Sequence, residues 1–398
     1  MQRPLHGLLP RAGFCGNLRV NEPETEQIAG SPKTMSEPKI NGLRSIELGV
    51  HDLQKSAEFY RRVWALEDVS GEGDTLHLRG TSRDHHVLTL RERPRAGLLG
   101  VHFSAPDRAT VDALHAKAKA MGMKIAVPAG DLEKSAGGGY GFRVSTPEGH
   151  PIVISSDVAD HGSAIDDKTR PTKLTHVVLN SADIGNQTSF FIDVLGFTWS
   201  DSTQMMDFVR CCSDHHSVAL ARGKGPSLNH MAYEMPDIDG LMRGAGRVRK
   251  SGYEIMWGVG RHGPGSNVFS YFVEPNGFVT EYTTEVEQVD DSYVFHDAAY
   301  WKSLNIFPCR WGMAGMPSEL ARKGMSGELV EEENQRCEQV NDSYAAHDAQ
   351  WWNDQKVFPC RWQMAGVPSP FARKAMGGEL VEEENLRCEQ VMAKALGR

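Results

Sequence analysis

The sequence predicts an α+β fold built from four similar modules, each with the order strand, helix and further strands. Two observations indicate this fold. Short runs of β-branched and aromatic residues alternate with segments that have apolar residues at helical spacing, and the same order of elements recurs in both halves of the chain. Moreover, one compact core is not expected for a chain of 398 residues. We therefore expect two tandem domains that arose by duplication, followed by a different kind of tail.

The first domain is predicted at residues 41–160. Residues 1–40 are rich in Pro, Gly, Asn and Glu and have no periodicity, so we expect them to form a disordered extension. In order, the elements predicted in the domain are a strand at Ile46–Val50, a helix at Leu53–Trp64, strands at Thr75–Leu78 and His86–Leu90, a strand from Leu99, a helix at Ala113–Met121, and strands up to Ile152.

The second domain is predicted at residues 171–286, after a polar linker at 157–173. It ends in two strands with a tight turn between them, because Glu274-Pro-Asn-Gly277 has the residues of a turn and apolar alternation continues on both sides. In order, the elements predicted in this domain are a strand from Leu174, a helix at 186–195, a strand from Leu228, a helix at 237–252, and the two strands Val268–Val273 and Phe278–Tyr282.

A carboxylate on the last predicted strand suggests a metal site. The period of two places Glu281 on the inner face of an otherwise apolar strand, where a charge is costly unless it is paired or bound to a metal. Two upstream strands each carry a histidine near their start, His176 and His230. Two imidazoles and one carboxylate from three strands form the facial triad of non-haem Fe(II) oxygenases. We therefore expect these three residues to bind one metal ion.

The first half lacks these ligands. When the two halves are aligned, Ser45, Gly100 and Val153 stand at the positions of the two histidines and the glutamate. We therefore expect the first domain to be structural and to bind no metal. Asp84-His-His86 echoes Asp214-His-His216, but His86 has no ligands nearby and is interpreted as structural.

With these motifs, residues 171–285 resemble the catalytic domain of the extradiol catechol dioxygenases of the vicinal oxygen chelate superfamily. The resemblance implies two tandem vicinal-oxygen-chelate domains, whose four βαβββ modules form two half-open barrels. It places the metal ligands at His176, His230 and Glu281. The segment around His216 resembles the one that bears the family's acid–base histidine, and His262 and Tyr271 match its substrate-facing histidine and tyrosine.

The resemblance implies Fe(II) as the cofactor, with Mn(II) an alternative because the same ligands suit both metals. The partners would be a catechol and O₂, and the product a hydroxymuconic-semialdehyde type of compound. His216 would move a proton, since its ordinary pKa lies near neutrality, while His262 and Tyr271 would hydrogen-bond the phenolate. His215 is expected on the opposite strand face. The family often has a further His or Asp in the loop after His262, where this chain has Gly265 and Ser266.

Two other classes of function remain open. One is a metal-dependent isomerase or lyase of the same superfamily, such as a glyoxalase, which usually has four ligands where this chain offers three. The other is a protein of the superfamily that binds an aromatic ligand without catalysis. Retention of all three metal ligands argues against this second class.

The tail, residues 287–398, contains a sequence repeat. Residues 287–337 recur as 338–388 with a period of 51, and 34 of 51 positions are identical. The spacing of its histidines and cysteines matches no zinc module. In family members that have such a tail, one segment packs beside the mouth of the active site. We therefore expect the first copy, with Tyr293, Tyr300, Trp301 and Trp311, to shape the entrance.

Composition excludes several partners. The net charge is −9 with a pI of about 6.0, and the sequence has no basic stripe, so no nucleic-acid partner is expected. No apolar run approaches the length of a membrane span. Seven cysteines scattered over the chain fit a reducing compartment, so we expect a cytoplasmic protein. A homo-oligomer is also expected.

Overall fold

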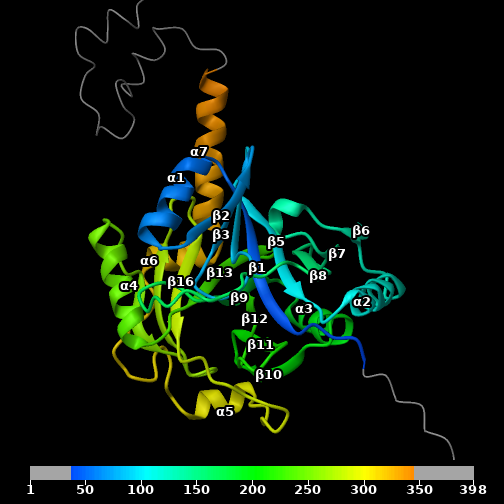
Figure 1. Ribbon diagram of the computed structural model, residues 1–398. Coiled ribbons are helices and arrows are strands. Elements are labelled where there is room, and N and C mark those ends of the chain that lie inside the picture. The colour runs from blue at the N-terminus through cyan, green and yellow to red at the C-terminus, as the bar shows by residue number, and fades with distance from the viewer. Residues whose placement is uncertain (1–36, 345–398) are drawn as a thin grey trace, which may run out of the picture. The chain divides into compact units, whose positions relative to one another are not determined.

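Two eight-stranded sheets with the same strand order form the main part of the protein, for which a computed structural model describes residues 37–344 (Figure 1). The first sheet has the order β2-β3-β4-β1-β5-β8-β7-β6 and the second β10-β11-β12-β9-β13-β16-β15-β14. The repeated order confirms the predicted duplication. The strands are β1 Gly42–Val50, β2 Glu67–Glu72, β3 Thr75–Arg79, β4 Leu88–Glu92, β5 Gly97–Ser104, β6 Ile125–Asp131, β7 Tyr140–Ser145, β8 Pro151–Ser156, β9 Leu174–Ser181, β10 Thr198–Ser202, β11 Met206–Arg210, β12 Val218–Arg222, β13 Ser227–Glu234, β14 Trp257–Arg261, β15 Val268–Val273 and β16 Val279–Thr284.

Each of the four modules begins its helix in the same way. The first residue before the helix is an aspartate whose side chain accepts a hydrogen bond from the first turn, which satisfies a backbone N–H that has no partner within the helix. The four caps are Asp52, Asp107, Asp183 and Asp237. The helices are α1 Leu53–Glu58, α2 Arg108–Ala120, α3 Ile184–Ser189, α4 Ile238–Lys250, α5 Ala298–Ser303, α6 Glu319–Met325 and α7 Glu328–Tyr344, with a short 3₁₀ turn η2 at Lys134–Ala136 and π-helical turns η1 Phe59–Val63 and η3 Phe190–Val194.

The predicted elements are confirmed, but some boundaries differ. The predicted helices at Leu53–Trp64 and 186–195 each change midway from an α-helix to a π-helical turn, in which the hydrogen bonds span five residues instead of four. The apolar spacing continues through the change, so the sequence pattern did not indicate it. Ile40, assigned to the extension, is fully buried, and its N–H donates to the carbonyl of Leu195. Residues 1–36 of the predicted extension and 345–398 of the tail lie outside the described residues. No helix within the described part is long and apolar enough to cross a membrane.

The two sheets share one hydrophobic core, so the expectation that one core would not form was wrong. Its buried members come from both halves, and Trp64 connects them most directly. The Trp64 ring stacks on Tyr282, with 3.7 Å between ring centroids, and the Tyr282 hydroxyl donates to the carbonyl of Trp64 at 2.7 Å. Arg247 donates to the same hydroxyl at 3.0 Å. Because the core is continuous, we expect the two halves to unfold together.

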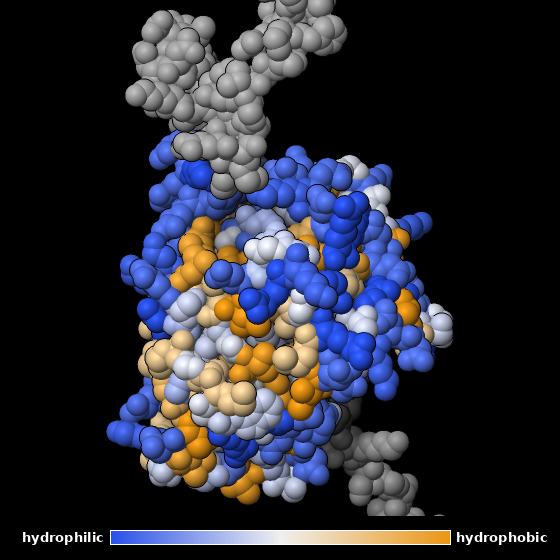
Figure 2. All heavy atoms as spheres, turned by 90° about the vertical axis from the view of Figure 1, so that its left-hand side faces the viewer, coloured by the Kyte–Doolittle hydropathy of each residue, from blue (hydrophilic) through white to orange (hydrophobic). Residues whose placement is uncertain are grey.

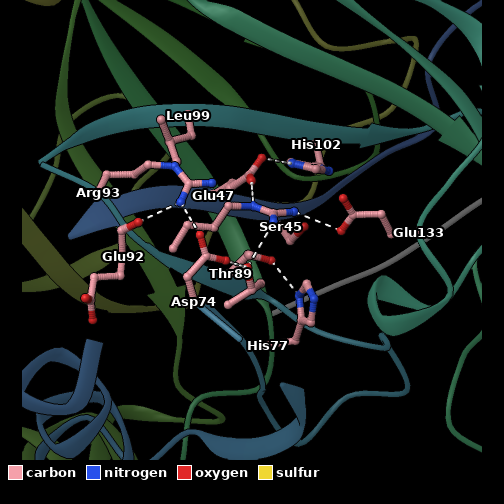
Figure 3. A network of polar contacts seen from close by, with 12 residues as sticks. Ser45, Glu47, Asp74, His77, Thr89, Glu92, Arg93, Leu99, His102 and Glu133 are labelled. Carbon is pink, nitrogen blue, oxygen red and sulfur yellow. Dashed lines mark hydrogen bonds and ion pairs between the residues drawn. The ribbon is translucent and has the colours of Figure 1, made fainter. Parts of the chain in front are cut away.

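Charged side chains form a network in the first barrel, the sheet of strands β1–β8 (Figure 3); the sheet of strands β9–β16 is the second barrel. Glu47 accepts hydrogen bonds from Arg91 at 2.5 Å and from Arg143 at 2.9 Å, and His102 Nε2 lies 3.4 Å from its carboxylate. Burial opposes the ionisation of Glu47, but His102 and the two arginines hold its pKa well below its ordinary value. The carboxylate is therefore ionised and paired with cations from neighbouring strands.

The first tail copy packs along the second sheet. Cys309 and Ala314 are buried against Phe269 and Tyr271 of β15. Farther along, the side chain of Asn334 in α7 exchanges hydrogen bonds with the backbone of Ala96 in the first domain. The tail thus contacts both halves.

The same tail segment leaves several large apolar side chains exposed. Figure 2 shows apolar side chains at the surface on one side of the molecule. Exposed apolar residues of this kind are typical of a contact between proteins when they cluster. The expected homo-oligomer stays a prediction. The exposed large apolar residues of the tail are Val294, Phe295, Tyr300, Leu304, Phe307, Trp311, Met313, Met316 and Leu320.

Candidate metal centre

Three potential metal ligands converge inside the second barrel. His176 Nε2 lies 3.2 Å from Glu281 Oε2, and His230 Nε2 lies 3.3 Å from the same oxygen. All three residues are buried, and the ligand atoms lie within 4.8 Å of one another. Within residues 37–344 this is the group of His, Cys, Asp or Glu side chains that could hold a metal ion.

The register of three neighbouring strands brings these residues together. Ala232 on β13 pairs with His176 on β9 and with Glu281 on β16. His230 lies two residues before Ala232, so it points to the same face of the sheet. A small residue at the middle position leaves space between the three longer side chains.

The same register tests the alignment of the two halves. In the first sheet, His102 pairs with both Ser45 and Val153, and Gly100 lies two residues before it. Ser45, Gly100 and Val153 therefore occupy the positions of the three ligands, as the sequence predicted. A Cβ atom on Gly100 would lie 2.9 Å from His102 Nε2 and 3.2 Å from Glu47 Oε2. The charge network thus takes up the space that a ligand at this position would need.

The residues of the second barrel fit a divalent metal. His230 Nδ1 lies 2.8 Å from Asn229 Oδ1, which must accept from it, so Nε2 is left without a proton and makes no hydrogen bond. Burial opposes the charge of Glu281, but the two histidines hold its pKa well below its ordinary value. Asn267 donates to the other carboxylate oxygen at 3.3 Å. His176 Nε2 is hydrogen-bonded to Glu281 Oε2 at 3.2 Å. Two imidazole nitrogens and one carboxylate are ligands that Fe(II) and Mn(II) accept.

The other three predicted site residues surround this triad. The ring of His216 lies 4.4 Å from that of His176, measured between centroids. On another side, His262 Nε2 and the Tyr271 hydroxyl are hydrogen-bonded at 2.9 Å, and the ring of Tyr271 meets that of His230 edge-on at 5.1 Å. All six residues predicted from the sequence therefore lie together.

Burial shifts the ionisation of these groups. It lowers the pKa of His262 to about 4 and that of His216 well below its ordinary value, with the neighbouring histidines contributing in the same direction. Burial and the nearby Glu281 raise the pKa of the Tyr271 hydroxyl. At neutral pH, and before any metal binds, both histidines are therefore neutral and the tyrosine is protonated.

Aromatic residues that the sequence analysis did not single out support the His262–Tyr271 pair. Phe269 stacks on His262 with 4.0 Å between centroids, and Trp257 stacks on Tyr271 at 5.0 Å. Trp257 Nε1 in turn donates to the carbonyl of Gly315 in the tail at 2.8 Å. The tail therefore supports one wall of the site from behind.

The prediction for His215 was wrong. His215 and His216 precede β12, which begins at Val218, so the alternation of strand faces does not apply to them. Instead of pointing away, His215 Nδ1 lies 3.1 Å from His216 Nδ1. Its other nitrogen lies 2.9 Å from Asp201, a buried residue of β10 that sequence reasoning missed. Only the unusual placement of an acidic residue within a strand could have drawn attention to it.

Comparison with known proteins agrees with this geometry. The model of the Glyoxalase/Bleomycin resistance protein/Dioxygenase superfamily matches residues 42–154 and 173–282, which is more than half of the chain. The chain belongs to this superfamily. Each match covers one of the two sheets.

Within the superfamily the chain is related to extradiol dioxygenases. Metapyrocatechase 2 of Cupriavidus necator is 34% identical over 122 residues, which span 30% of this chain and only 38% of that protein. The manganese-dependent 2,3-dihydroxybiphenyl 1,2-dioxygenase of Geobacillus genomosp. 3 is 25% identical over 254 residues, 58% of this chain and 80% of that protein. The resemblance inferred from the sequence is therefore confirmed.

One solved structure is named for a different activity. The Mn(II)-bound glyoxalase from Novosphingobium aromaticivorans is 38% identical, with a TM-score of 0.67 over 71% of this chain and 94% of that chain. The names of these two relatives mention manganese, whereas the iron-dependent extradiol dioxygenase of Rhodococcus jostii (strain RHA1), 27% identical over 165 residues, 37% of this chain and 50% of that protein, is named for iron. A divalent metal at the His176–His230–Glu281 triad is supported by these relatives and by the convergence of the ligands.

Proposed function

We propose that the protein is an extradiol ring-cleaving dioxygenase, which inserts O₂ beside the vicinal diol of a catechol-type aromatic. The observation that carries the proposal is the set of groups around the triad. His216 borders it on one side and the His262–Tyr271 pair on another, and neither is a fourth ligand of the group. A metal ion held by only three protein ligands would have room to bind a catechol and O₂ as well.

A divalent iron or manganese ion held by His176, His230 and Glu281 would supply the Lewis-acid and redox chemistry for ring cleavage. Both metals suit two imidazoles and a carboxylate, and relatives are named for manganese and for iron. We propose Fe(II), with Mn(II) as the alternative.

His216 is the proposed general acid–base. It is neutral because burial and the nearby histidines lower its pKa, so it can accept a proton from a catechol hydroxyl. Burial also makes the protonated form unfavourable, which favours return of the proton later in the reaction. Of its two nitrogens, Nδ1 is held by His215, so Nε2 is the atom available for this exchange.

The His262–Tyr271 pair is the proposed binding site for the phenolate oxygen. The two side chains are hydrogen-bonded to each other at 2.9 Å and are held by ring stacking on Phe269 and Trp257. Because Tyr271 stays protonated, its hydroxyl can donate to an anionic oxygen without first losing a proton.

A glyoxalase-like isomerase is the second candidate, and the solved relative of that name favours it. Two observations support the dioxygenase instead. The potential metal-binding group of the described residues has three members rather than four, and the groups beside it match the acid–base and phenolate-binding roles. Binding of an aromatic ligand without catalysis does not account for three retained metal ligands.

The test is to load the full-length chain with Fe(II) under anaerobic conditions and measure O₂ uptake with catechol, 3-methylcatechol and 2,3-dihydroxybiphenyl. We expect one O₂ consumed per catechol and a yellow ring-opened product. The same preparation is also assayed with the hemithioacetal of methylglyoxal and glutathione. Isomerisation of the hemithioacetal without O₂ uptake from any catechol would establish the glyoxalase alternative.

Glu281→Ala tests the metal site directly. We expect loss of both bound metal, measured by elemental analysis, and ring cleavage. Glu274→Gln is the matched control, since Glu274 is a buried glutamate of the same hairpin whose carboxylate accepts hydrogen bonds from the turn rather than facing the triad. A Glu281→Ala protein with full metal content and activity would contradict the assignment.

A further inference from the structure

A chain of buried hydrogen bonds leads from His216 away from the metal centre. His216 Nδ1 lies 3.1 Å from His215 Nδ1, and His215 Nε2 lies 2.9 Å from Asp201 Oδ2. The three side chains are almost fully buried, and those of Asp201 and His215 are not exposed at all.

The carboxylate at the end of the chain determines the direction of its hydrogen bonds. A carboxylate can only accept, so a proton lies on His215 Nε2, and a His215 that carries one proton has a bare Nδ1. His216 must then donate from its own Nδ1, which leaves its Nε2 without a proton. Within residues 37–344, Nδ1 is the nitrogen of His216 that makes a hydrogen bond. This is the tautomer that a general base at Nε2 requires.

We propose that Asp201 and His215 are positioning residues that hold His216 in the tautomer with a free Nε2. The first tail copy holds Asp201 and His215 in place. The inference rests on the proposed function of His216 and deepens it. When Nε2 takes up a proton, the buried carboxylate two hydrogen bonds away also stabilises the resulting positive charge, as an aspartate does for the histidine of a catalytic triad.

The tail holds Asp201 in place. The backbone N–H of His296 donates to Asp201 Oδ1 at 2.9 Å, and the Tyr293 hydroxyl donates to Oδ2 at 3.1 Å. The strand that contains Asp201 also forms a parallel bridge with His296. With His215, these contacts give both carboxylate oxygens a donor, as a buried charge requires.

The tail also fixes the backbone around the two histidines. The N–H of His215 donates to the carbonyl of Glu287, and the N–H of Glu287 donates to the carbonyl of Gly265. Gly265 has a φ of +73°, and a Cβ atom there would lie 3.0 Å from the His216 ring and 3.2 Å from His215 Nδ1. Only glycine therefore lets the loop after His262 close on both rings.

The first barrel provides a comparison within the same chain. It has the corresponding pair, with His85 Nδ1 3.0 Å from His86 Nδ1. Strand register places Ser70 where the second barrel has Asp201, because Ser70 pairs with His77 and Asp201 pairs with Phe208 at equivalent positions. Ser70 donates to the carbonyl of Ser135 and leaves His85 without this carboxylate. Of the two barrels, only the second, which has the three potential metal ligands, therefore has an aspartate at this position beside its histidine pair.

The test reads the tautomers directly. Full-length chain labelled with ¹⁵N-histidine and loaded with diamagnetic Zn(II) is examined by long-range ¹H–¹⁵N correlation NMR, with His215→Gln and His216→Gln used for assignment. We expect a bare Nε2 and a protonated Nδ1 on His216. In Asp201→Asn, the amide NH₂ would face His215 Nε2, so His215 would bind its proton at Nδ1 and His216 would switch to the opposite tautomer.

Kinetics and a matched control complete the test. In the Fe(II) enzyme, Asp201→Asn should lower kcat by about 10²–10⁴-fold with little change in KM, as expected for a wrong tautomer. Asp207→Asn is the control, because Asp207 is also a buried aspartate of this sheet but its partners are Thr188 and Ser202. It should leave the His216 tautomer unchanged and kcat within a few-fold of wild type.

The outcomes separate this proposal from the proposed function. A bare Nδ1 on His216 in the wild type, or the same tautomer in wild type and Asp201→Asn, would overturn the positioning role. The expected tautomers in a protein that cleaves no catechol would support the hydrogen-bond chain and refute the dioxygenase. Equal loss of kcat in Asp201→Asn and Asp207→Asn would also overturn the proposal, since the effect would then be structural.

Discussion

Glu47→Gln should destabilise the whole protein without reducing the turnover of the molecules that remain folded. The substitution keeps the shape of the side chain but removes the charge that Arg91, Arg143 and His102 share. The side chain of Glu47 is only 5% exposed, whereas those of the two arginines are 20% and 31% exposed. The arginines can therefore regain part of their hydration when the carboxylate is lost.

The expected magnitude follows from these exposures. Removing one partner of a fully buried ion pair costs about 3–5 kcal/mol. Because both arginines are partly exposed and Arg91 keeps Glu133 as a second partner, we expect a loss of about 2–3 kcal/mol in the free energy of unfolding. Glu133→Gln is the control, since Glu133 is 61% exposed and its pair with Arg91 should contribute less than about 1 kcal/mol.

The pH dependence has a definite sign. The pKa of Glu47 in the folded protein lies below its value in the unfolded chain, so the unfolded state binds the proton more readily. The stabilisation by Glu47 is therefore complete above a pH of about 4.3, the ordinary pKa of a glutamate, and is lost as the pH falls towards the folded-state pKa. The difference in stability between wild type and Glu47→Gln should narrow below that pH.

Urea unfolding followed by far-UV circular dichroism measures the effect at pH 7 and at steps below pH 5. Since the two halves share one core, a single unfolding transition should report the loss in the free energy of unfolding. Catechol turnover per bound metal should remain near wild type, because the network lies in the barrel without the metal ligands. The reasoning would be refuted if Glu47→Gln were as stable as Glu133→Gln, or if the difference from wild type were independent of pH.

Three further predictions concern the metal count and the tail. Purified full-length chain should bind one tightly held Fe(II), measured by elemental analysis; two per chain, with one lost on deletion of residues 43–157, would show a second site in the first domain. Truncation after Gln339 should leave turnover near wild type, whereas truncation after Val286 should raise KM or abolish activity; equal turnover by two folded truncated proteins would separate the tail from the site. Deleting residues 287–337 would join the second copy to the second domain in place of the first copy. We expect a kcat/KM above that of the chain truncated after Val286 but below that of wild type, because the second copy has Ala375 at the position of Gly324. A Cβ atom at Gly324 would lie 2.6 Å from Val279.

The metal triad was predictable because each ligand lies in a regular strand. The turn at Glu274–Gly277 fixed the phase of the last strand, so Glu281 could be assigned to the inner face, and the strand patterns around His176 and His230 were equally clear. The duplication added a second constraint, because two halves with the same element order must place equivalent residues alike. Tandem sheets of identical strand order satisfy both constraints.

The hydrogen-bond chain behind His216 was not predictable for the opposite reason. His215 lies in a loop, where no period determines the direction of a side chain. Asp201 is 14 residues from His215, and the tail donor Tyr293 is a further 78 residues along the chain. Contacts of this kind depend on the tertiary packing of the tail, which the residue pattern did not determine. The repeat showed that a tail existed, but not which surface it would cover.

The two barrels stabilise a buried carboxylate in different ways. Each encloses a polar centre at the same register, and a buried carboxylate at this centre needs positive charge around it. In the second barrel Glu281 has two imidazoles beside it and a place for a metal ion, while in the first Glu47 has two arginines and a histidine. The arginine network needs no ligand from outside, and it occupies the space at Gly100 where a metal-binding histidine would stand. The first barrel thus surrounds its buried carboxylate with cations of its own, and the groups proposed for catalysis, including Asp201 behind His216, lie in the second.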